Sequence, residues 1–153
     1  MIKLKKILCP IDFSECSLYA LSYAIDLSVK EHASLCLIHV IETHISDIGD
    51  IMKQIDLLLD GEQIESLRVK LLNLIPHDIR ATIHAESIVE KGIPFMEIMK
   101  TAKEKRIDLI VMGTHGRTGL EHILIGSVAE RVIQKAPCPV LSIRLPKQVF
   151  SMP

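Results

Sequence analysis

The chain of 153 residues has no tryptophan, and aromatic residues make up only 3% of it. Proteins that bind single-stranded nucleic acid stack the bases on aromatic side chains, so this scarcity argues against that function. The formal net charge is −1, so no overall field attracts DNA or an anionic membrane surface. We therefore expect neither nucleic acid nor a membrane as a partner.

Long hydrophobic runs and paired cysteines are also absent. No apolar run reaches the length of about 18 residues that a membrane span requires, and the first residues lack the apolar core of a secretory signal. Cys9, Cys16, Cys36 and Cys138 form no C-x-x-C pair. Three of them lie in or beside apolar segments, where a free thiol behaves as a small hydrophobic group. We expect inert thiols and a cytoplasmic location.

Apolar runs alternate with amphipathic segments along the whole chain. We expect strands at 2–11, 34–41, 79–88, 107–112 and 139–144. We expect helices at 14–29, at 47–75 with a break at Asp60-Gly61, at 94–105 and at 128–135. This alternation predicts an α/β fold with a doubly wound five-stranded parallel sheet, strand order 3-2-1-4-5, and helices on both faces. We expect one domain over 1–146, followed by a short tail at 147–153.

Glycines punctuate the segment that follows the run 107–112. Gly113 and Gly116 flank Thr114 and His115, and Gly126-Ser127 precede an amphipathic segment. Glycine lets the backbone approach a ligand closely and adopt positive φ, while a serine can cap the following helix and still offer its hydroxyl. The spacing fits neither the lysine-containing P-loop nor the G-x-G-x-x-G fingerprint. It indicates a different loop that presents backbone N–H groups to phosphate.

The expected strand order places a second segment beside this loop. The chain reverses direction between the first and fourth strands, and ligands of such sheets bind where the carboxyl ends of those strands diverge. Pro10, Ile11 and Asp12 end the first strand, so they reach the same crevice as the glycine loop. A carboxylate beside phosphate is repulsive unless it holds a metal or a ribose hydroxyl. Asp12 therefore either serves the ligand or caps the helix that begins near Ser14.

These motifs together resemble the ATP-binding branch of the universal stress protein family. The resemblance rests on Gly113-x2-Gly116-x9-Gly126-Ser127, on Ala136-Pro137-Cys138-Pro139-Val140, and on the opening Lys6-Ile7-Leu8-Cys9-Pro10-Ile11-Asp12-Phe13-Ser14. It covers nearly the whole chain, with little specificity between about 46 and 77. It implies a fold like that of the adenine-nucleotide α-hydrolases.

The resemblance also implies a set of ligand-binding residues. Pro10 and Ile11 would form the pocket wall, Val40 would contact adenine through its main chain, and Asp12 would lie near the nucleotide and a divalent metal such as Mg²⁺. The triphosphate would be bound by the end of the fourth strand, the glycine loop and the following helix start: Met112, Gly113, Thr114, His115, Gly116, Arg117, Thr118, Gly119, Gly126, Ser127 and Val128.

Two histidines and one arginine have ambiguous roles on the residues alone. His39 sits in an apolar segment, which favours a hydrogen-bonded core residue over a ligand. His115 belongs to the loop and could contact phosphate, although no nucleophile or orienting partner for it is apparent. Arg117 could pair with phosphate oxygens or extend into solvent.

The function predicted from these features is ATP binding by a cytoplasmic stress or regulatory module, without an assigned catalytic residue. The apolar edge strand at 139–144 would form a homodimer, as the resemblance implies, and a regulatory protein partner remains unidentified. The alternative is an enzyme of the same fold group that hydrolyses ATP slowly or transfers adenylate. A phosphate-accepting receiver domain and a flavin-binding domain fit poorly, because the required acidic residues and aromatic rings are missing from the expected positions.

Overall fold

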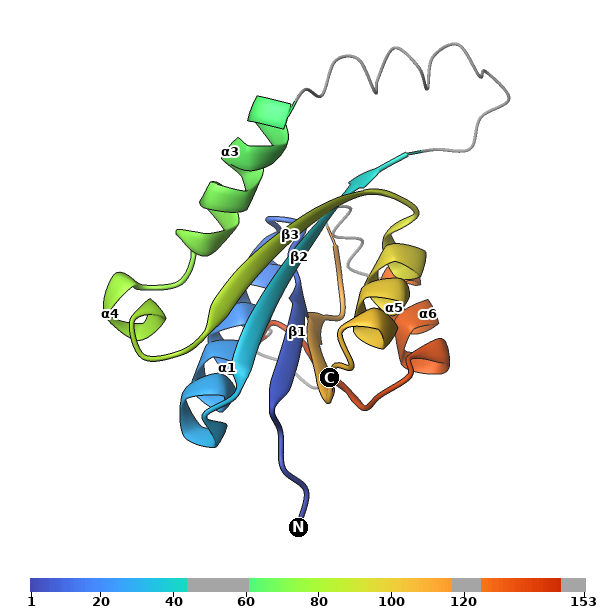
Figure 1. Cartoon of the computed structure of the whole chain (residues 1–153). Coiled ribbons are helices and arrows are strands. Elements are labelled where there is room, and N and C mark those ends of the chain that lie inside the picture. Colours follow the sequence, from blue (N-terminus) through green and yellow to red (C-terminus); the bar gives the residue numbers. More distant parts are fainter. Residues whose placement is uncertain (44–60, 117–124, 147–153) are drawn as a thin grey trace, which may run out of the picture.

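The structure, a computed structural model, describes residues 1–43, 61–116 and 125–146. Its strands are β1 (Lys6–Pro10), β2 (Ser34–Glu42), β3 (Ala85–Gly92), β4 (Leu109–Gly113) and β5 (Val140–Ile143). Its helices are α1 (Glu15–Glu31), α3 (Gly61–Leu72), α4 (His77–Arg80), α5 (Pro94–Glu104) and α6 (Ser127–Lys135). Figure 1 shows the sheet in the middle, with α1, α3 and α4 beyond one face and α5 and α6 beyond the other.

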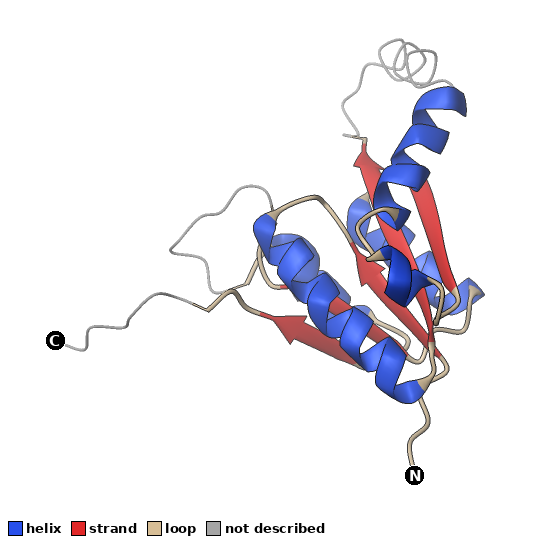
Figure 2. Ribbon diagram, turned by 90° about the vertical axis from the view of Figure 1, so that its left-hand side faces the viewer, coloured by secondary structure: helices blue, strands red, loops and turns tan. Residues whose placement is uncertain are grey.

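The five strands form one parallel sheet in the order β3-β2-β1-β4-β5, which confirms the predicted fold. The register pairs Leu8 of β1 with Cys36 of β2 on one side and with Ile110 of β4 on the other. β1 is thus the central strand, and the chain crosses to opposite sides of it in its two halves. Figure 2, turned by 90°, shows helices on both faces of the strands.

Strict alternation along the strands explains why both faces are buried. Ile7 and Cys9 of β1 join the core beneath α1 and α3, whereas Leu8 between them joins the core beneath α5 and α6. Successive strand side chains point to opposite faces, so a strand covered by helices on both sides must be apolar at every position. Each such fully buried aliphatic side chain stabilises the fold by about 1.5–3 kcal/mol.

One predicted strand was wrong in position. The segment 79–88 was predicted as the third strand from its alternating apolar residues, but β3 begins only at Ala85. Ile79 belongs to the short helix α4, and the N–H groups of Thr82 and Ile83 donate to its carbonyl. Ile79 and Ile83 both pack against the core because they are four residues apart in a helical turn. Two residues that are four positions apart lie on the same face of a strand and also on the same side of a helical turn, so the sequence pattern fits both structures.

The first strand is also shorter than predicted: the prediction was 2–11, and β1 spans Lys6–Pro10. The backbone N–H groups of Lys5 and Lys6 both donate to the Asp108 carboxylate, each at 2.9 Å. The predicted helical segment 47–75 is described only from residue 61, where α3 begins; its remainder and the tail at 147–153 lie outside the described residues. Among the helices of the described ranges, none combines the length and apolar character that crossing a membrane demands.

Candidate functional site

The candidate site lies at the carboxyl ends of β1 and β4, which are hydrogen-bonded neighbours. β1 continues from this edge into α1, and β4 continues into the glycine loop. The two connections leave toward opposite faces of the sheet, since α1 covers one face and α6 the other. This is the point of reversal at which parallel α/β sheets bind ligands.

The turn between β1 and α1 presents the carboxylate of Asp12. Its Oδ1 accepts the backbone N–H of Ser14 at 2.9 Å. Ser14, and not Asp12, is the N-cap of α1, because the Ser14 side chain accepts the N–H of Ser17 at 3.2 Å. The capping alternative for Asp12 is therefore wrong, and its Oδ2 extends toward Gly116 of the other loop.

Thr114 organises the glycine loop through its backbone. Its N–H donates to the carbonyl of Ile143 at the end of β5 at 2.9 Å, and its carbonyl accepts the N–H of Gly126 at 2.6 Å. The chain thus leaves β4 at Thr114 and returns beside it at residue 126. These bonds bring the N-terminus of α6 next to the carboxyl end of β4, although the residues between 116 and 125 are not described.

At each of the three glycines of the motif, an added methyl group would lie unusually close to a neighbouring atom. Among the glycines of the described ranges, Gly92 alone has a φ in the left-handed region, so Gly113, Gly116 and Gly126 do not use positive φ. A methyl group on Gly113 would lie 2.8 Å from Cys16 Sγ, and one on Gly116 would lie 2.9 Å from Asp12 Oδ2. One on Gly126 would lie 3.1 Å from the Thr114 carbonyl oxygen.

The start of α6 provides backbone donors at this edge. Gly126 is its N-cap, with φ −69° and ψ 155°, and no side chain caps the helix there. Ser127 was predicted as a possible cap; it is instead the first helical residue, and it is exposed. The first N–H groups of a helix have no partner within the helix, so Ser127 and Val128 carry donors suited to an anion.

The remaining predicted residues are distributed around the same edge or fall outside the description. Pro10 ends β1 and Ile11 follows it at 2% exposure. Met112 is the residue before the last of β4, and Val40 lies half-buried near the end of β2. Their predicted contacts with a nucleotide stay predictions. Arg117, Thr118 and Gly119 lie outside the described residues.

The two histidines nearest the crevice have different surroundings. His39 is 7% exposed, and its Nδ1 lies 2.7 Å from the Ile11 carbonyl oxygen, which confirms the prediction of a hydrogen-bonded core residue. His115 is half-buried in the loop, and its Nδ1 lies 2.8 Å from the hydroxyl of the buried Thr114. His115 is thereby oriented by its own neighbour.

Phe13 is a residue at this edge that the sequence analysis missed. Its backbone φ is 63°, in the left-handed region that aromatic residues rarely adopt, and its ring packs against that of His39. Strained residues of this kind cluster at functional sites. The available signal was its place directly after Asp12, between the end of a strand and a helix cap.

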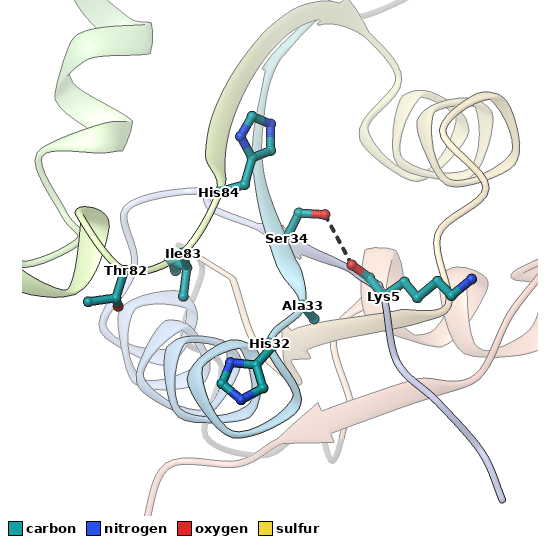
Figure 3. A pocket seen from close by; sticks show the side chains of 7 residues that line it. All are labelled: Lys5, His32, Ala33, Ser34, Thr82, Ile83 and His84. Atoms are coloured by element: carbon teal, nitrogen blue, oxygen red, sulfur yellow. Dashed lines mark hydrogen bonds between the residues drawn. The ribbon is translucent and has the colours of Figure 1, made fainter.

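A cavity of about 230 Å³ lies at the opposite end of the sheet. It is lined by Lys5, His32, Ala33, Ser34, Thr82, Ile83 and His84 (Figure 3). The Ser34 hydroxyl donates to the Lys5 carbonyl and the Thr82 hydroxyl donates to the Ile79 carbonyl, so both hydroxyl protons are used within the protein. The rings of His32 and His84 point apart in Figure 3, so the lining does not converge on a common ligand position.

Burial makes the thiols of Cys9 and Cys36 poorly suited to redox or metal chemistry. Cys9, Cys16 and Cys36 are buried. Burial, followed by the negative charge of Glu86, raises the pKa of the Cys36 thiol to about 12, and burial also raises the pKa of Cys9. The reactive form of cysteine is the thiolate. Within the described part of the chain, no group of three His, Cys, Asp or Glu side chains could hold a metal ion.

Comparisons with known proteins agree with this geometry. A family model described as "Universal stress protein family" matches residues 3–144. The chain is 40% identical over 149 residues to universal stress protein MJ0531 of Methanocaldococcus jannaschii, an alignment that covers 94% of this chain and 84% of that protein. The solved structure of MJ0577 from the same organism has a TM-score of 0.79 at 32% identity and covers 96% of this chain and 100% of its own.

Two further solved structures contain an adenine nucleotide. One is a universal stress protein in complex with cAMP, with a TM-score of 0.65 at 21% identity, covering 93% of this chain and 98% of its own. The other is a family protein from Arabidopsis thaliana with AMP bound, with a TM-score of 0.56 at 20% identity, covering 92% and 91%. At these identities the likeness shows the shared fold.

Proposed function

The chain belongs to the universal stress protein family, and from that premise we propose that it binds ATP in the crevice between the 11–14 turn and the glycine loop. The adenine nucleotides in the cAMP- and AMP-bound relatives support an adenine nucleotide as the ligand class. The observation that carries the proposal is the meeting of Asp12 with Gly116 at the reversal point of the sheet.

The loop and helix groups each have a role in this proposal. The phosphates lie against the backbone N–H groups at the start of α6, where the helix dipole also favours negative charge. Gly116 and Gly126 leave the loop backbone open to close approach. Val40 contacts adenine through its main chain, and Pro10 and Ile11 form the adjacent wall.

The chemistry of Asp12 is compatible with Mg²⁺ that arrives with the nucleotide. Mg²⁺ in nucleotide sites is held by one or two carboxylates together with the phosphates and water, so no cluster of protein ligands is required. Oδ1 accepts the Ser14 N–H, and we propose that Oδ2, which lies toward Gly116, contacts the ion or a ribose hydroxyl. The ion would offset the repulsion between this carboxylate and the phosphates.

The proposed biological role is that of a cytoplasmic, homodimeric regulatory module whose nucleotide state is sensed by partners. Two features support it: the family and the edge strand β5. Slow hydrolysis of ATP is the alternative activity and is addressed by a kinetic prediction below.

Isothermal titration with ATP and Mg²⁺ tests the binding proposal. We expect the wild type to bind ATP, and Gly116→Ala to weaken binding at least tenfold, about 1.4 kcal/mol, because the added methyl displaces the Asp12 carboxylate. The matched control is Gly61→Ala, since a methyl there meets no atom of the described residues within 4 Å. A wild type that binds no adenine nucleotide at millimolar concentration would contradict the proposal. Equal affinity for ATP and AMP would contradict a role for the loop in holding the outer phosphates.

A further inference from the structure

Phe13 combines an unfavourable backbone conformation with ring contacts on two sides. Its φ of 63° places it in the left-handed region. Its ring centroid lies 5.0 Å from that of His39, with the ring planes inclined by 56°. The Lys70 ammonium of α3 lies 4.5 Å from the same ring centroid. The contacts of the ring hold a conformation that its backbone disfavours.

His39 fixes the same turn from the side of β2. The Ile11 carbonyl can only accept a hydrogen bond, so the Nδ1 of His39, 2.7 Å away, carries the proton. The N–H of Ile11 in turn donates to the Ile38 carbonyl at 2.8 Å. Residue 11 is therefore tied to β2 at both its N–H and its carbonyl, and residue 13 is tied to β2 through its ring.

Asp12 lies between these two fixed residues. Its position depends on the peptide planes on either side, which are set by the Ile11 carbonyl and by the φ of Phe13. With both held, Asp12 Oδ1 meets the Ser14 N–H at 2.9 Å and Oδ2 is directed to Gly116. Releasing either anchor lets the carboxylate rotate away from the glycine loop.

We propose that His39 and Phe13 are positioning residues for the ligand site: they hold the 11–13 turn so that the Asp12 carboxylate faces Gly116 before any nucleotide arrives. The expected consequence is tighter nucleotide binding, and in this respect the inference rests on the proposed function. A preorganised turn binds more tightly because the ligand does not have to order it. Neither side chain needs to touch the nucleotide for this effect.

Two substitutions of His39 separate positioning from packing. His39→Asn retains an N–H donor near the place of Nδ1, and His39→Leu removes the donor while filling the space. We expect His39→Leu to weaken ATP binding tenfold or more, and His39→Asn to stay within about threefold of the wild type. Ile98→Ala is the control for lost stability, since Ile98 is a residue of α5 that is buried in the core on the other face of the sheet; it should lower the melting temperature and leave ATP affinity unchanged.

A second readout needs no nucleotide. Hydrogen exchange of the Ser14 amide reports directly on its bond to Asp12 Oδ1, and ¹⁵N NMR reports the protonated nitrogen of His39. We expect slow exchange of Ser14 in the wild type and in His39→Asn, and exchange at least tenfold faster in His39→Leu. Equal exchange in all three would overturn the inference. Slow exchange in a wild type that binds no ATP would instead overturn the proposed function alone.

Phe13→Gly tests the role of the ring. Glycine adopts a φ of 63° without strain, so a role confined to the backbone predicts no loss. We expect faster exchange of the Ser14 amide and weaker ATP binding, because the contact with His39 is gone. Combined with His39→Leu, it should add little further loss, since both substitutions release the same turn. Retention of both properties by Phe13→Gly would remove Phe13 from the inference.

Discussion

At the scale of single residues, glycines of one motif serve different purposes. Gly113 is required by the packing of α1 on β4, because an added methyl would lie 2.8 Å from Cys16 Sγ and 3.0 Å from the Cys16 carbonyl carbon and oxygen. Gly116 is restricted by the Asp12 side chain alone among neighbouring atoms of the described residues. Substitution should therefore affect stability at the first position and ligand binding at the second.

Gly113→Ala should destabilise the protein by about 1–3 kcal/mol through overpacking. Cys16→Ala removes the nearest clashing atom, so the double variant should recover part of this loss, although the clash with the Cys16 backbone persists. Urea unfolding of the wild type, both single variants and the double variant measures the coupling. Strict additivity of the two effects would show that the sulfur is not the obstacle.

The sequence predicted the location of site residues where that location follows from their place at the end of a strand. The expected strand order predicted that the segment after the first strand and the glycine loop meet at one edge, and the structure brings Asp12 to Gly116 there. The reason for each glycine could not be predicted, because it depends on which helix packs against which strand. The same holds for Phe13, whose conformation follows from contacts with His39 and Lys70 of other elements.

At the scale of elements, the strand order was predictable and one strand boundary was not. Right-handed crossovers and fully apolar strands leave few ways to arrange five strands, and the order 3-2-1-4-5 follows. The start of β3 was missed because Ile79 and Ile83 lie on one side of a helical turn that mimics alternation. The backbone hydrogen bonds from Thr82 and Ile83 to the Ile79 carbonyl distinguish the turn from a strand, and the sequence pattern does not reveal them.

The outer edge of β5 has a defined set of backbone groups. The carbonyls of Pro139 and Ile143 accept N–H groups from β4 and the following loop. Backbone groups alternate in direction along a strand, so residue 141 also faces β4, whereas Val140 and Ser142 direct their N–H groups outward. A second copy that pairs with this edge would use Val140 and Ser142.

Ser142→Pro should therefore convert the expected homodimer to a monomer while leaving the fold intact, since proline is tolerated where an edge N–H faces solvent. Leu141→Pro is the contrasting variant, because it removes a donor that faces β4 and should destabilise the sheet itself. Light scattering gives the mass, and far-UV circular dichroism reports the fold. A monomeric wild type at micromolar concentration, or a dimeric Ser142→Pro, would argue against pairing through β5.

At the scale of the whole molecule, the buried central strands support the site, and backbone N–H groups form much of it. β1 and β4 are buried over most of their length, and in the described part of the chain the crevice includes main-chain donors, the Asp12 carboxylate and the His115 ring. We expect these groups to hold a nucleotide in its ground state. Binding the ground state and the transition state equally well gives affinity without rate.

This arrangement predicts slow turnover of any bound ATP. Fast phosphoryl transfer requires groups that neutralise charge on the transferred phosphoryl group and a residue that orients the attacking water. Asp12 Oδ1 accepts the Ser14 N–H, and the Nδ1 of His115 lies 2.8 Å from the Thr114 hydroxyl; neither of these two contacts supplies such a group. We expect hydrolysis well below about one turnover per second, the lower end of the usual enzyme range.

A steady-state ATPase assay measures this turnover, with His115→Ala and Asp12→Asn as the informative variants. Turnover faster than about one per second that is lost in either variant, while the variant still binds ATP, would make the protein an enzyme, because the lost group would then act on the reaction and not on binding.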